Sequence, residues 1–573
     1  MLSIEVKRRS VKAALVLSLI LVLLIFRIVY INMFKGNELS VITREQYIIN
    51  EPISDIKYML LDSNNKELLE YENKFYFAVD VDSYIKNNRD TDIAQLNTLI
   101  YTLRGYNKDY DLTKFKYNMT NKRLYYEVDE ETYYKLKNIR GIKGTYSFVK
   151  NVVDRYNSWD YENILTSPLD SNNKPKEEGS IESYIANVTE SNIYPYISFE
   201  KDVNGAIKDG KYVVPEKNIN VKLTTDREME DKIKEVISNN DWKDYDQIGV
   251  VVMEASTGKI KAMVQRDSWK PNINLCSATE NGFEPGSIFK TIVEEAALEK
   301  DKSLVNLATR CNESENSHGL INMEEAYTLS CNTYYEQLAS LVGFKDIYMT
   351  AFNQGFFQKV LNFSGNYEVT GDIVAPEELD LKKLFGKDYN KLKNISFAPS
   401  SLSMIGIGQS MRVSPLQALA IVNTVVNNGV YVKPYLVDSL VNNNGDEIER
   451  FTTIKNKVLK KSTASIVKGH MRKVVTDDKG TGKLAYVKGL ECGGKTGTNT
   501  RYGLEDSELK KFSDGWFAGY VKKEGKYYSI IVYVHDIDVE NEGGGTTAAP
   551  IFKSVVEKIF LNRQQIHRAR IEY

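Results

Sequence analysis

The chain of 573 residues shows almost no excess of either charge, because 75 lysines and arginines stand against 77 aspartates and glutamates. A net charge of −2 gives no reason to expect nucleic acid or an anionic membrane surface as a partner. Internal repeats and long low-complexity tracts are also absent, so the sequence gives no sign of a repeat architecture. A chain of this length exceeds what one hydrophobic core supports, and about two to four domains are expected.

Only one long hydrophobic run is present, and it lies near the N-terminus. Residues 13–26 are uncharged and almost all apolar, and the run resumes after Arg27 to residue 34. About twenty-two helical residues span roughly 33 Å, enough for a bilayer core of about 30 Å. We therefore predict a transmembrane anchor over residues 13–34, with Arg27 near its outer end. A cleaved signal peptide is the alternative, but the run is long and lacks an A-x-A-like site.

Basic residues precede this run: Lys7, Arg8, Arg9 and Lys12. By the positive-inside rule, residues 1–12 are expected to form a cytoplasmic tail. No second run of comparable length follows, so the rest of the chain is expected outside the cytoplasm. The expected localisation is thus the cell membrane, with a single span and an extracytoplasmic catalytic domain. ATP is scarce there, which weighs against a nucleotide-driven function.

The remainder divides into two regions of different pattern. Residues 37–217 read as a small α+β region without an obvious catalytic cluster. The elements expected after them are a strand, an amphipathic helix, two β-hairpins and a closing helix, at residues 218–226, 227–239, 248–265, 516–536 and 551–560. Strands at both ends with helical material between them predict an antiparallel sheet packed against helices, in an α+β fold.

The stretch GLECGGKTGT, residues 489–498, is compatible with two kinds of chemistry. Its first eight residues match the phosphate-binding pattern G-x-x-x-x-G-K-[ST]. Its last four residues match the Lys-Thr-Gly element of penicillin-binding proteins and β-lactamases. They are Lys495, Thr496, Gly497 and Thr498. A phosphate loop should open an apolar helix, but residues 497–503 are polar and turn-like, and a similar GTGK at 480–483 has the wrong spacing. We therefore interpret the stretch as a strand that carries Lys-Thr-Gly.

A serine and a lysine lie one helical turn apart in EPGSIFKT. Pro285 and Gly286 signal a turn, and a helical pattern follows, so Ser287 should open a helix with Lys290 on the same face. A serine hydroxyl becomes a nucleophile when an adjacent base takes its proton, and a lysine of depressed pKa can do this. Alone the pair is a weak signal, because serine is a common N-cap and lysine a common surface residue.

Two further elements follow in order along the chain. Ser330, Cys331 and Asn332 form an S-x-N triplet, and Lys495 begins the Lys-Thr-Gly element. A hairpin precedes the first element and a strand pair follows the last. Chance agreement of all three elements in this order is improbable, so we interpret them as parts of one site.

On these motifs, the chain from residue 218 resembles the transpeptidase domain of class B penicillin-binding proteins. The resemblance extends to NVKLTTD, GVVVMEASTGKIKAMV, IGIGQSMRVSPLQALAIVNTVVNNG, DGWFAGY and TTAAPIFK. Residues 56–84 resemble the start of the family's non-catalytic pedestal, although the Arg-Gly usual before its Asp is missing. The implied domains are a pedestal at 37–217 and a penicillin-binding transpeptidase domain at 218–573.

The resemblance implies a serine-type D-Ala-D-Ala transpeptidase that cross-links peptidoglycan stem peptides and is acylated by β-lactams. Ser287 would attack the penultimate D-Ala carbonyl, and Lys290 would be the base. Ser330 and Lys495 would relay protons to the leaving amine, while Asn332 orients the acyl-enzyme. No cofactor is required for this chemistry.

The residues after the third motif's lysine have implied roles in binding the donor. Thr496 and Thr498, with Gly497 between them, would bind its terminal carboxylate, and the N–H groups of Ser287 and Thr498 would form the oxyanion hole. No glycosyltransferase domain fits before residue 218. The implied partners are therefore stem peptides, β-lactams and a separate membrane-embedded glycan polymerase in a wall-synthesis complex.

Related proteins use the same serine and lysine for other purposes. A D,D-carboxypeptidase differs only in taking water as the acceptor, and a β-lactamase needs a deacylating base that the sequence does not reveal. A membrane-anchored β-lactam sensor needs an output domain, for which the short cytoplasmic tail leaves no room. A catalytically weak wall-synthesis scaffold would be expected to carry a decayed motif, and none of the three has decayed.

Cysteine is scarce, with four residues at positions Cys276, Cys311, Cys331 and Cys492. An even count outside the cytoplasm is compatible with a disulfide. Cys311, His318 and Cys331, however, form a set of soft ligands suited to zinc. Their segment also resembles one by which some class B enzymes hold zinc beside the active site.

The fourth zinc ligand is not evident from the sequence, and the candidates are Asp301, Glu313, Glu315 or water. A Cys311–Cys331 disulfide and free buried thiols remain as alternatives. The other histidines are expected to be ordinary surface or strand residues. They are His470, His535 and His567.

Overall fold

The computed structural model describes residues 4–31, 47–114, 122–154, 181–268, 270, 272–276, 282–311, 317–361, 371–373, 399–505 and 508–561. Contacts divide the chain into two compact units. The first unit comprises Met1–Lys57, Tyr71–Val153 and Asn192–Glu216, and the second comprises Tyr58–Glu70, Asp154–Ser191 and Lys217–Tyr573. The predicted border after residue 217 lies one residue from the start of the second unit's longest segment. The roles assigned to the two domains stay predictions.

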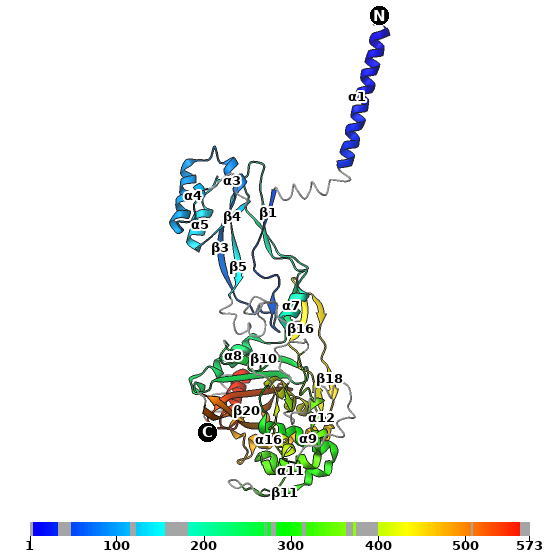
Figure 1. Ribbon diagram of the computed structural model, residues 1–573, viewed down its shortest axis with the longest axis vertical. Helices are drawn as coiled ribbons and strands as arrows, with labels where there is room; N and C mark the ends of the chain where they lie inside the picture. The colour runs from blue at the N-terminus through cyan, green and yellow to red at the C-terminus, as the bar shows by residue number, and fades with distance from the viewer. Residues whose placement is uncertain are drawn as a thin grey trace. The chain divides into compact units, whose positions relative to one another are not determined.

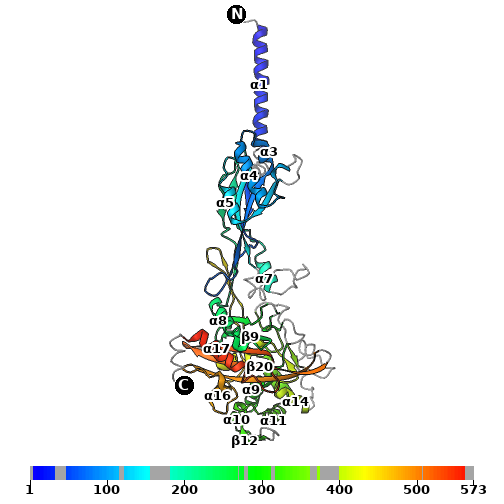
Figure 2. The same ribbon diagram turned by 90° about the vertical axis from the view of Figure 1, so that its left-hand side faces the viewer.

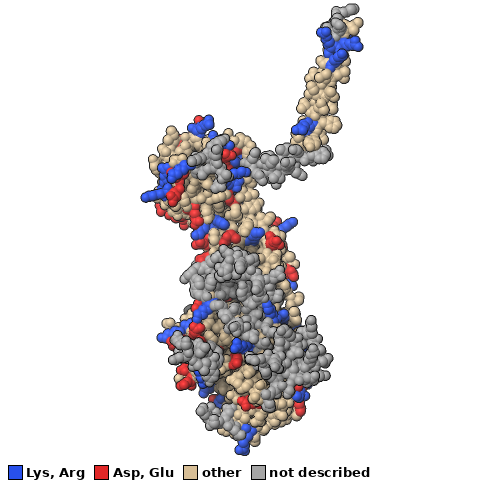
Figure 3. Space-filling view, viewed as in Figure 1, with Lys and Arg blue, Asp and Glu red and all other residues tan. Residues whose placement is uncertain are grey.

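One helix among the described residues is long and apolar enough to cross a membrane. This helix, α1, spans Ile4–Tyr30, and its Lys7–Tyr30 part has a mean hydropathy of 2.7 and is not buried. Figure 3 shows basic side chains gathered at the N-terminal end of α1 and uncharged side chains along most of its length. The helix fits a single-pass membrane anchor. Residues 32–34 of the predicted span lie outside the described residues.

The first unit contains two small antiparallel sheets. In sheet order their strands are β4 (Arg123–Val128), β3 (Tyr71–Asp80) and β5 (Thr145–Val153), and β1 (Ile48–Pro52), β6 (Tyr196–Glu200) and β7 (Lys211–Val213). Helices α4 (Ile93–Tyr106) and α5 (Glu130–Lys137) lie beside the first sheet, where Leu103 and Leu136 pack with Phe77 (Figure 1).

The second unit is built on a five-stranded antiparallel sheet. In sheet order its strands are β10 (Lys259–Gln265), β9 (Gln247–Glu254), β21 (Lys526–Ile537), β20 (Glu508–Lys523) and β19 (Glu491–Glu505). The predicted hairpins are therefore confirmed, as β9–β10 and β20–β21. Strand β9, from the middle of the chain, pairs with β21 near the C-terminal end. Figure 2 shows the green β9 and the orange β20 in this unit.

Side chains of the central strands alternate between two hydrophobic cores. On β20, Trp516 and Tyr520 lie in one core, whereas Phe517 and Val521 lie in the other. Successive residues of a strand point to opposite faces, so a sheet covered on both faces needs apolar residues at almost every position. This explains the continuous apolar runs from which these strands were predicted.

Helices cover both faces of the sheet. One core includes α8 (Arg227–Ile237) and α17 (Ala548–Phe560), and these confirm the predicted amphipathic and closing helices. The helices of the other core are α9 (Lys290–Lys300), α11 (Asn332–Val342), α15 (Pro415–Val426) and α16 (Lys461–Thr476). The α+β fold class predicted from the sequence is thus confirmed.

A second, smaller sheet belongs to the same unit, with strands β17 (Glu447–Arg450), β16 (Val437–Asn442), β8 (Ile219–Leu223) and β2 (Leu60–Leu61). β2 pairs in parallel with β8, and the N–H of Met59 donates to Oδ1 of Asn220 at 2.8 Å. These contacts agree with the assignment of residues 58–70 to the second unit. The sequence analysis assigned them to the pedestal at 37–217. A two-residue strand is too short to give a periodic signal.

The remaining elements named below are short. They are η4 (Gly286–Phe289), β11 (Ala308–Cys311), β12 (Gly319–Asn322), α10 (Met323–Thr328), α12 (Phe344–Phe352), β15 (Val430–Val432) and β18 (Lys455–Lys457).

Candidate active site

Ser287 lies in η4, one turn of 3-10 helix directly before α9. The predicted helix therefore begins as a 3-10 turn, and Lys290 is the first residue of its α-helical part. Gly286 has a φ of +54°, and a Cβ there would lie 2.4 Å from the carbonyl oxygen of Thr498. Only glycine tolerates both conditions. The turn that carries Ser287 is thus in direct contact with strand β19.

The S-x-N triplet forms the tight connection between α10 and α11. Ser330 has a φ of +58°, a left-handed conformation that a non-glycine residue adopts at some cost. The N–H of Cys331 donates to the carbonyl of Ala326, and Cys331 is the N-cap of α11. Asn332 is then the first residue of that helix. This backbone directs polar groups of Ser330 and Asn332 toward α9, as their bonds to Lys290 show.

Lys290 is fully buried and makes three hydrogen bonds to the S-x-N triplet. Its Nζ donates to the carbonyl oxygen of Ser330 at 2.6 Å, to Oδ1 of Asn332 at 2.6 Å and to Oγ of Ser330 at 3.3 Å. It also lies 5.5 Å from the ring centroid of Tyr335. Three acceptors and an aromatic ring suit a protonated amine, which has three hydrogens to donate.

Lys495 approaches the same hydroxyl from the sheet. Its Nζ donates to Oγ of Ser330 at 2.8 Å and to the carbonyl of Thr496 at 3.1 Å. Burial lowers the pKa of Lys495 well below its usual value, the charge of Lys290 lowers it further, and the charge of Glu294 opposes both. An amine of lowered pKa at Lys495 therefore faces a hydroxyl that also contacts Lys290.

The rest of the Lys-Thr-Gly element lies on the same strand, β19. Oγ1 of Thr496 lies 2.8 Å from Oγ1 of Thr481, and Oγ1 of Thr498 accepts from the N–H of Gly544 at 3.0 Å. A Cβ on Gly497 would lie 2.8 Å from the carbonyl oxygen of Pro285, in the turn before Ser287. The structure thus brings the three predicted motifs together.

Residues 497–503 are not turn-like, so this part of the sequence interpretation is wrong. β19 continues through them to Glu505 and pairs residue by residue with β20. Backbone hydrogen bonds to the partner strand do not depend on side-chain polarity, which is why the polar composition was misleading. The conclusion against a phosphate loop holds, because a strand rather than a helix follows the motif.

Two polar features of this region were missed in the sequence. The GTGK segment at 480–483, set aside for its spacing, supplies Thr481 to the Lys-Thr-Gly strand. His470 was expected to be an ordinary surface or strand residue, and this is wrong. It lies buried on α16, with its Nδ1 2.6 Å from Oε1 of Glu294. No local motif marks either contact, and the partners His470 and Glu294 are 176 residues apart in sequence.

The two remaining histidines are His535 and His567. His535 lies on strand β21, as expected, with Nδ1 2.8 Å from Oδ1 of Asp514. His567 lies outside the described residues.

The predicted metal ligands lie close together beside this site. Donor atoms of Cys311, His318 and Cys331 are all within 4.8 Å of one another, with Nδ1 of His318 3.3 Å from Sγ of Cys311. Both cysteines are buried free thiols, so the disulfide alternative is wrong. Asp301 is not part of the group, since its side chain accepts from the N–H of Ser303. Glu313 and Glu315 lie outside the described residues.

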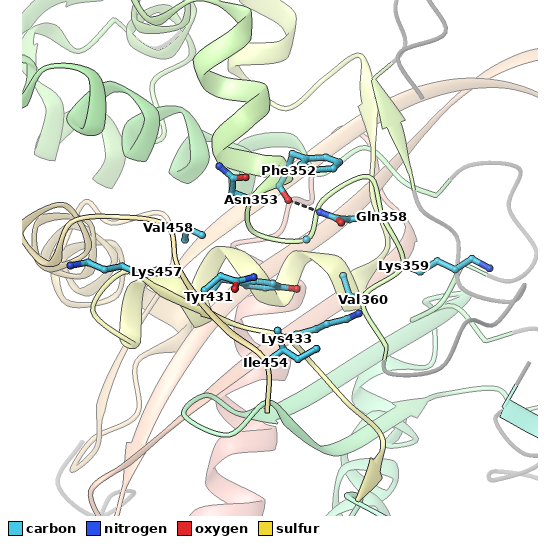
Figure 4. A pocket seen from close by; sticks show the side chains of 12 residues that line it. Phe352, Asn353, Gln358, Lys359, Val360, Tyr431, Lys433, Ile454, Lys457 and Val458 are labelled. Carbon is cyan, nitrogen blue, oxygen red and sulfur yellow. Dashed lines mark hydrogen bonds between the residues drawn. The ribbon is translucent and has the colours of Figure 1, made fainter. Parts of the chain in front are cut away.

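A cavity of about 580 Å³ lies elsewhere in the second unit. It is lined by the end of α12, the segment after it, and the strands β15 and β18 (Figure 4). The side-chain amide of Gln358 donates to the carbonyl of Phe352 at its rim. Figure 4 shows Lys359 and Lys457 extending toward opposite sides, away from the other lining residues. None of the predicted site residues lines this cavity.

The fold and the motifs agree with a known protein family. A family model described as the penicillin binding protein transpeptidase domain matches residues 248–557. This range exceeds half of the chain and includes all three motifs. The chain therefore belongs to the penicillin-binding protein transpeptidase family, and the recognition made from the sequence is confirmed.

Individual relatives are distant in sequence. The chain is 26% identical over 385 residues to the stage V sporulation protein D of Bacillus subtilis, an alignment covering 60% of this chain and 54% of the relative. It is 24% identical over 341 residues to a peptidoglycan D,D-transpeptidase FtsI homolog of Mesostigma viride, covering 54% and 56%. It is 22% identical over 395 residues to penicillin-binding protein PbpB of Mycolicibacterium smegmatis, covering 63% and 57%. The chain thus spans about half the length of the curated relatives it matches.

Solved structures share the fold. Penicillin-binding protein 3 of Mycobacterium tuberculosis, complexed with aztreonam, matches with a TM-score of 0.58 at 16% identity over 91% of this chain and 98% of that chain. Its ampicillin complex matches with a TM-score of 0.57 at 17% identity over 91% and 97%. At this identity, the likeness supports the fold alone.

Proposed function

We propose that this chain is a peptidoglycan D,D-transpeptidase that works through an acyl-enzyme on Ser287. The observation that carries the proposal is the position of Ser330, whose Oγ lies 3.3 Å from Nζ of Lys290 and 2.8 Å from Nζ of Lys495. A hydroxyl between two amines, one of them depressed in pKa, is suited to pass a proton from one to the other. The family membership and the names of the relatives support the same reaction class.

Acylation begins with a proton transfer between the lysines. Lys290 passes a proton through Oγ of Ser330 to the neutral amine of Lys495, and the freed amine of Lys290 takes the proton of Ser287. Oγ of Ser287 then forms a bond to the penultimate D-Ala carbonyl carbon, and the π electron pair moves onto the oxygen. The N–H groups of Ser287 and Thr498 stabilise this oxyanion.

Collapse of the tetrahedral intermediate completes the half-reaction. The C–N bond breaks, and Lys495 returns its proton through Ser330 to the leaving amine. Terminal D-Ala departs, and the two lysines regain their starting protonation. The hydroxyls of Thr496 and Thr498 hold the carboxylate of the donor before it leaves, while Asn332 orients the acyl chain.

Deacylation repeats these steps with a new nucleophile. Lys290 again passes its proton through Oγ of Ser330 to Lys495, and an amine of a neighbouring stem peptide attacks the ester carbonyl and gives its proton to the freed amine of Lys290. The C–O bond to Ser287 breaks, and Oγ of Ser287 takes the proton of Lys495 through Ser330. This leaves an amide cross-link between two strands and returns both lysines to their starting protonation. A D,D-carboxypeptidase would use water in place of this amine.

The proposal includes zinc at Cys311, His318 and Cys331. Two thiols and an imidazole at this mutual distance match the ligand types that zinc prefers. Bound zinc would supply structural cross-linking rather than reaction chemistry. Because Cys331 lies between Ser330 and Asn332, ligation would fix the connection that presents both side chains to Lys290.

The cellular setting also belongs to the proposal. Residues 1–12 would lie in the cytoplasm, α1 would cross the membrane, and both units would lie outside. The proposed partners are stem peptides, β-lactams and a membrane-embedded glycan polymerase of a wall-synthesis complex. Solved complexes of the mycobacterial penicillin-binding protein 3 with aztreonam and ampicillin support the β-lactam part.

The intact mass of the full chain, in detergent with a penicillin, tests the proposal. We expect a mass gain of one ring-opened drug on the wild type and none on Ser287→Ala. An assay with a labelled acceptor amine then distinguishes the two reactions. A transpeptidase releases an amide product that carries the label, whereas a carboxypeptidase releases the free acid. A folded wild type that gains no mass would contradict the proposal.

A further inference from the structure

A buried carboxylate lies one helical turn beyond Lys290. Glu294 on α9 is fully buried, and both of its oxygens are occupied. Oε2 accepts from the hydroxyl of Tyr335 at 2.6 Å, and Oε1 lies 2.6 Å from Nδ1 of His470. Both oxygens of this carboxylate therefore contact polar groups of neighbouring helices in the buried interior.

The next residue has the opposite environment. Glu295 is also fully buried, but its one recorded partner is the side-chain amide of Gln354, which donates to Oε2 at 2.6 Å. Burial raises the pKa of Glu295 to about 8, and the charge of Glu294 adds to this effect. The two adjacent carboxyls therefore differ in their surroundings, because Glu294 has a polar partner at both oxygens and Glu295 has one at Oε2.

Aromatic rings separate this charge from the two lysines. Nζ of Lys290 lies 5.5 Å from the ring centroid of Tyr335, whose hydroxyl bonds to Glu294. Nζ of Lys495 lies 5.7 Å from the ring of Tyr327, which packs 6.0 Å from the ring of His470. All of these side chains are buried, so water does not screen the charge from the lysines.

We propose that Glu294 is a positioning residue of the acyl-transfer site, held in place by Tyr335 and His470, and that its charge retains one proton on the Lys290–Lys495 pair. The inference rests on the proposed function, because it concerns the two lysines that move protons there. Without this charge, two buried amines close together would both favour the neutral form, and no proton would be left for the leaving group.

The electrostatic surroundings of Glu294 and His470 come from five elements. The ionisable groups facing them are Lys290 and Glu295 on α9, Glu324 and Tyr327 on α10, Tyr334 and Tyr335 on α11, His470 on α16, and Lys495 on β19. Burial alone would lower the pKa of His470, but the charge and hydrogen bond of Glu294, with the charge of Glu324, raise it above its usual value. A loss of the Glu294 charge thus has a spectroscopic signature at His470.

The sign of the effect on activity follows from the charge. The reaction needs a lysine pair that carries one proton, so its rate has an acidic and an alkaline limb set by the pair's two macroscopic pKa values. A nearby negative charge raises both values. Glu294→Gln should therefore move both limbs to lower pH by about one unit.

The test is the rate of penicillin acylation of the full chain as a function of pH. We compare the wild type with Glu294→Gln and with Glu295→Gln. The second variant is the matched control, because it makes the same chemical substitution one residue away. Glu295 is already neutral below pH of about 8, so its variant should leave both limbs in place through neutral pH. In the same samples, the NMR titration of His470 should move to lower pH in Glu294→Gln alone.

Two results would overturn the inference. One is a Glu294→Gln profile with unshifted limbs, whatever its height, because a purely structural role changes amplitude only. The other is an equal shift in both variants. Absence of any adduct on the wild type would instead refute the proposed function, and this inference with it.

A second variant keeps the test decisive if Glu294→Gln does not fold. Glu294→Met combined with Tyr335→Phe and His470→Phe removes the charge and both of its partners, so that no buried polar group is left unpaired. We expect the same downward shift of both limbs. Limbs at the wild-type positions in this variant would contradict the inference.

Discussion

Nζ of Lys495 donates a hydrogen bond to Oγ of Ser330 at 2.8 Å, and this contact joins the sheet to the helical connection that carries the S-x-N triplet. The same hydroxyl lies 3.3 Å from Nζ of Lys290. No other hydroxyl recorded among the described residues bonds to both lysines. In the proposed mechanism, the proton passes between the two amines through this hydroxyl.

Replacing Ser330 by alanine should slow acylation by about 100-fold to 10,000-fold, the range typical of a lost proton-transfer group. The substitution leaves the left-handed backbone and its strain unchanged. Stopped-flow measurement of penicillin acylation checks the rate. Ser340→Ala, an exposed residue of α11, should react like the wild type. A Ser330→Ala rate within a factor of about three of the wild type would rule out this relay.

Gly286→Ala should abolish acylation, with a loss of more than about 100-fold, because displacement of the reacting groups by about 1 Å has such an effect. The new Cβ would meet the carbonyl of Thr498 at 2.4 Å, where the strand has no room to move without shifting the oxyanion donors. Gly489→Ala is the control. It has a comparable φ of +85° but nothing within 4 Å of the added Cβ. If both variants lost acylation, backbone strain at positive φ would explain the loss, and the contact with Thr498 would not be its cause.

Glu295→Gln should make the protein more stable at neutral and alkaline pH. The pKa of Glu295 rises from 4.5 to about 8 on folding, so the folded state keeps a proton that the unfolded state has released. The wild type therefore loses stability as pH rises from about 4.5 to about 8, by on the order of 3 kcal/mol at pH 7. The variant lacks this dependence. Urea unfolding at pH 5.5 and pH 8 measures it, with Glu299→Gln as the comparison.

Removal of zinc should lower the thermal stability of the wild type but not of His318→Ala. A structural zinc site contributes free energy to folding, and loss of one ligand lowers its affinity strongly. Metal analysis should find one zinc per chain in the wild type and less in the variant, and a chelator should lower the melting temperature of the wild type only. Cys492→Ser, a buried cysteine outside the group, should behave like the wild type. A wild type purified without zinc that takes up none would refute the site.

Sequence patterns predicted the sheet hairpins and the α+β class correctly, and the structure brings Lys290, Ser330 and Lys495 of the three motifs together. Each of these signals is local, either a period of two along a strand or a motif of three or four residues. The burial of His470 against Glu294 and the pairing of residues 60–61 with β8 were not predicted. Both depend on contacts between segments more than a hundred residues apart, for which spacing along the chain gives no signal.

The metal group shows an intermediate case. Cys311, His318 and Cys331 carry ligand chemistry that residue type alone reveals, and the fold brings their donor atoms within 4.8 Å. Their closeness depends on the pairing of β11 with β12, which faces Cys311 with Gly319, the residue after His318. The hairpin explains why Cys311 and His318 lie close together, and zinc binding by the three residues stays a prediction.

Strand β19 is an edge strand of the main sheet, and its neighbour among the described strands is β20. Under the proposed function, an extended donor peptide would join the sheet here as an additional strand. Main-chain recognition of this kind is indifferent to the side chains of the peptide. Selectivity for the donor would then reside at the end of the peptide, which the hydroxyls of Thr496 and Thr498 are proposed to bind. Such an enzyme would tolerate diverse stem peptides while remaining strict about their terminus.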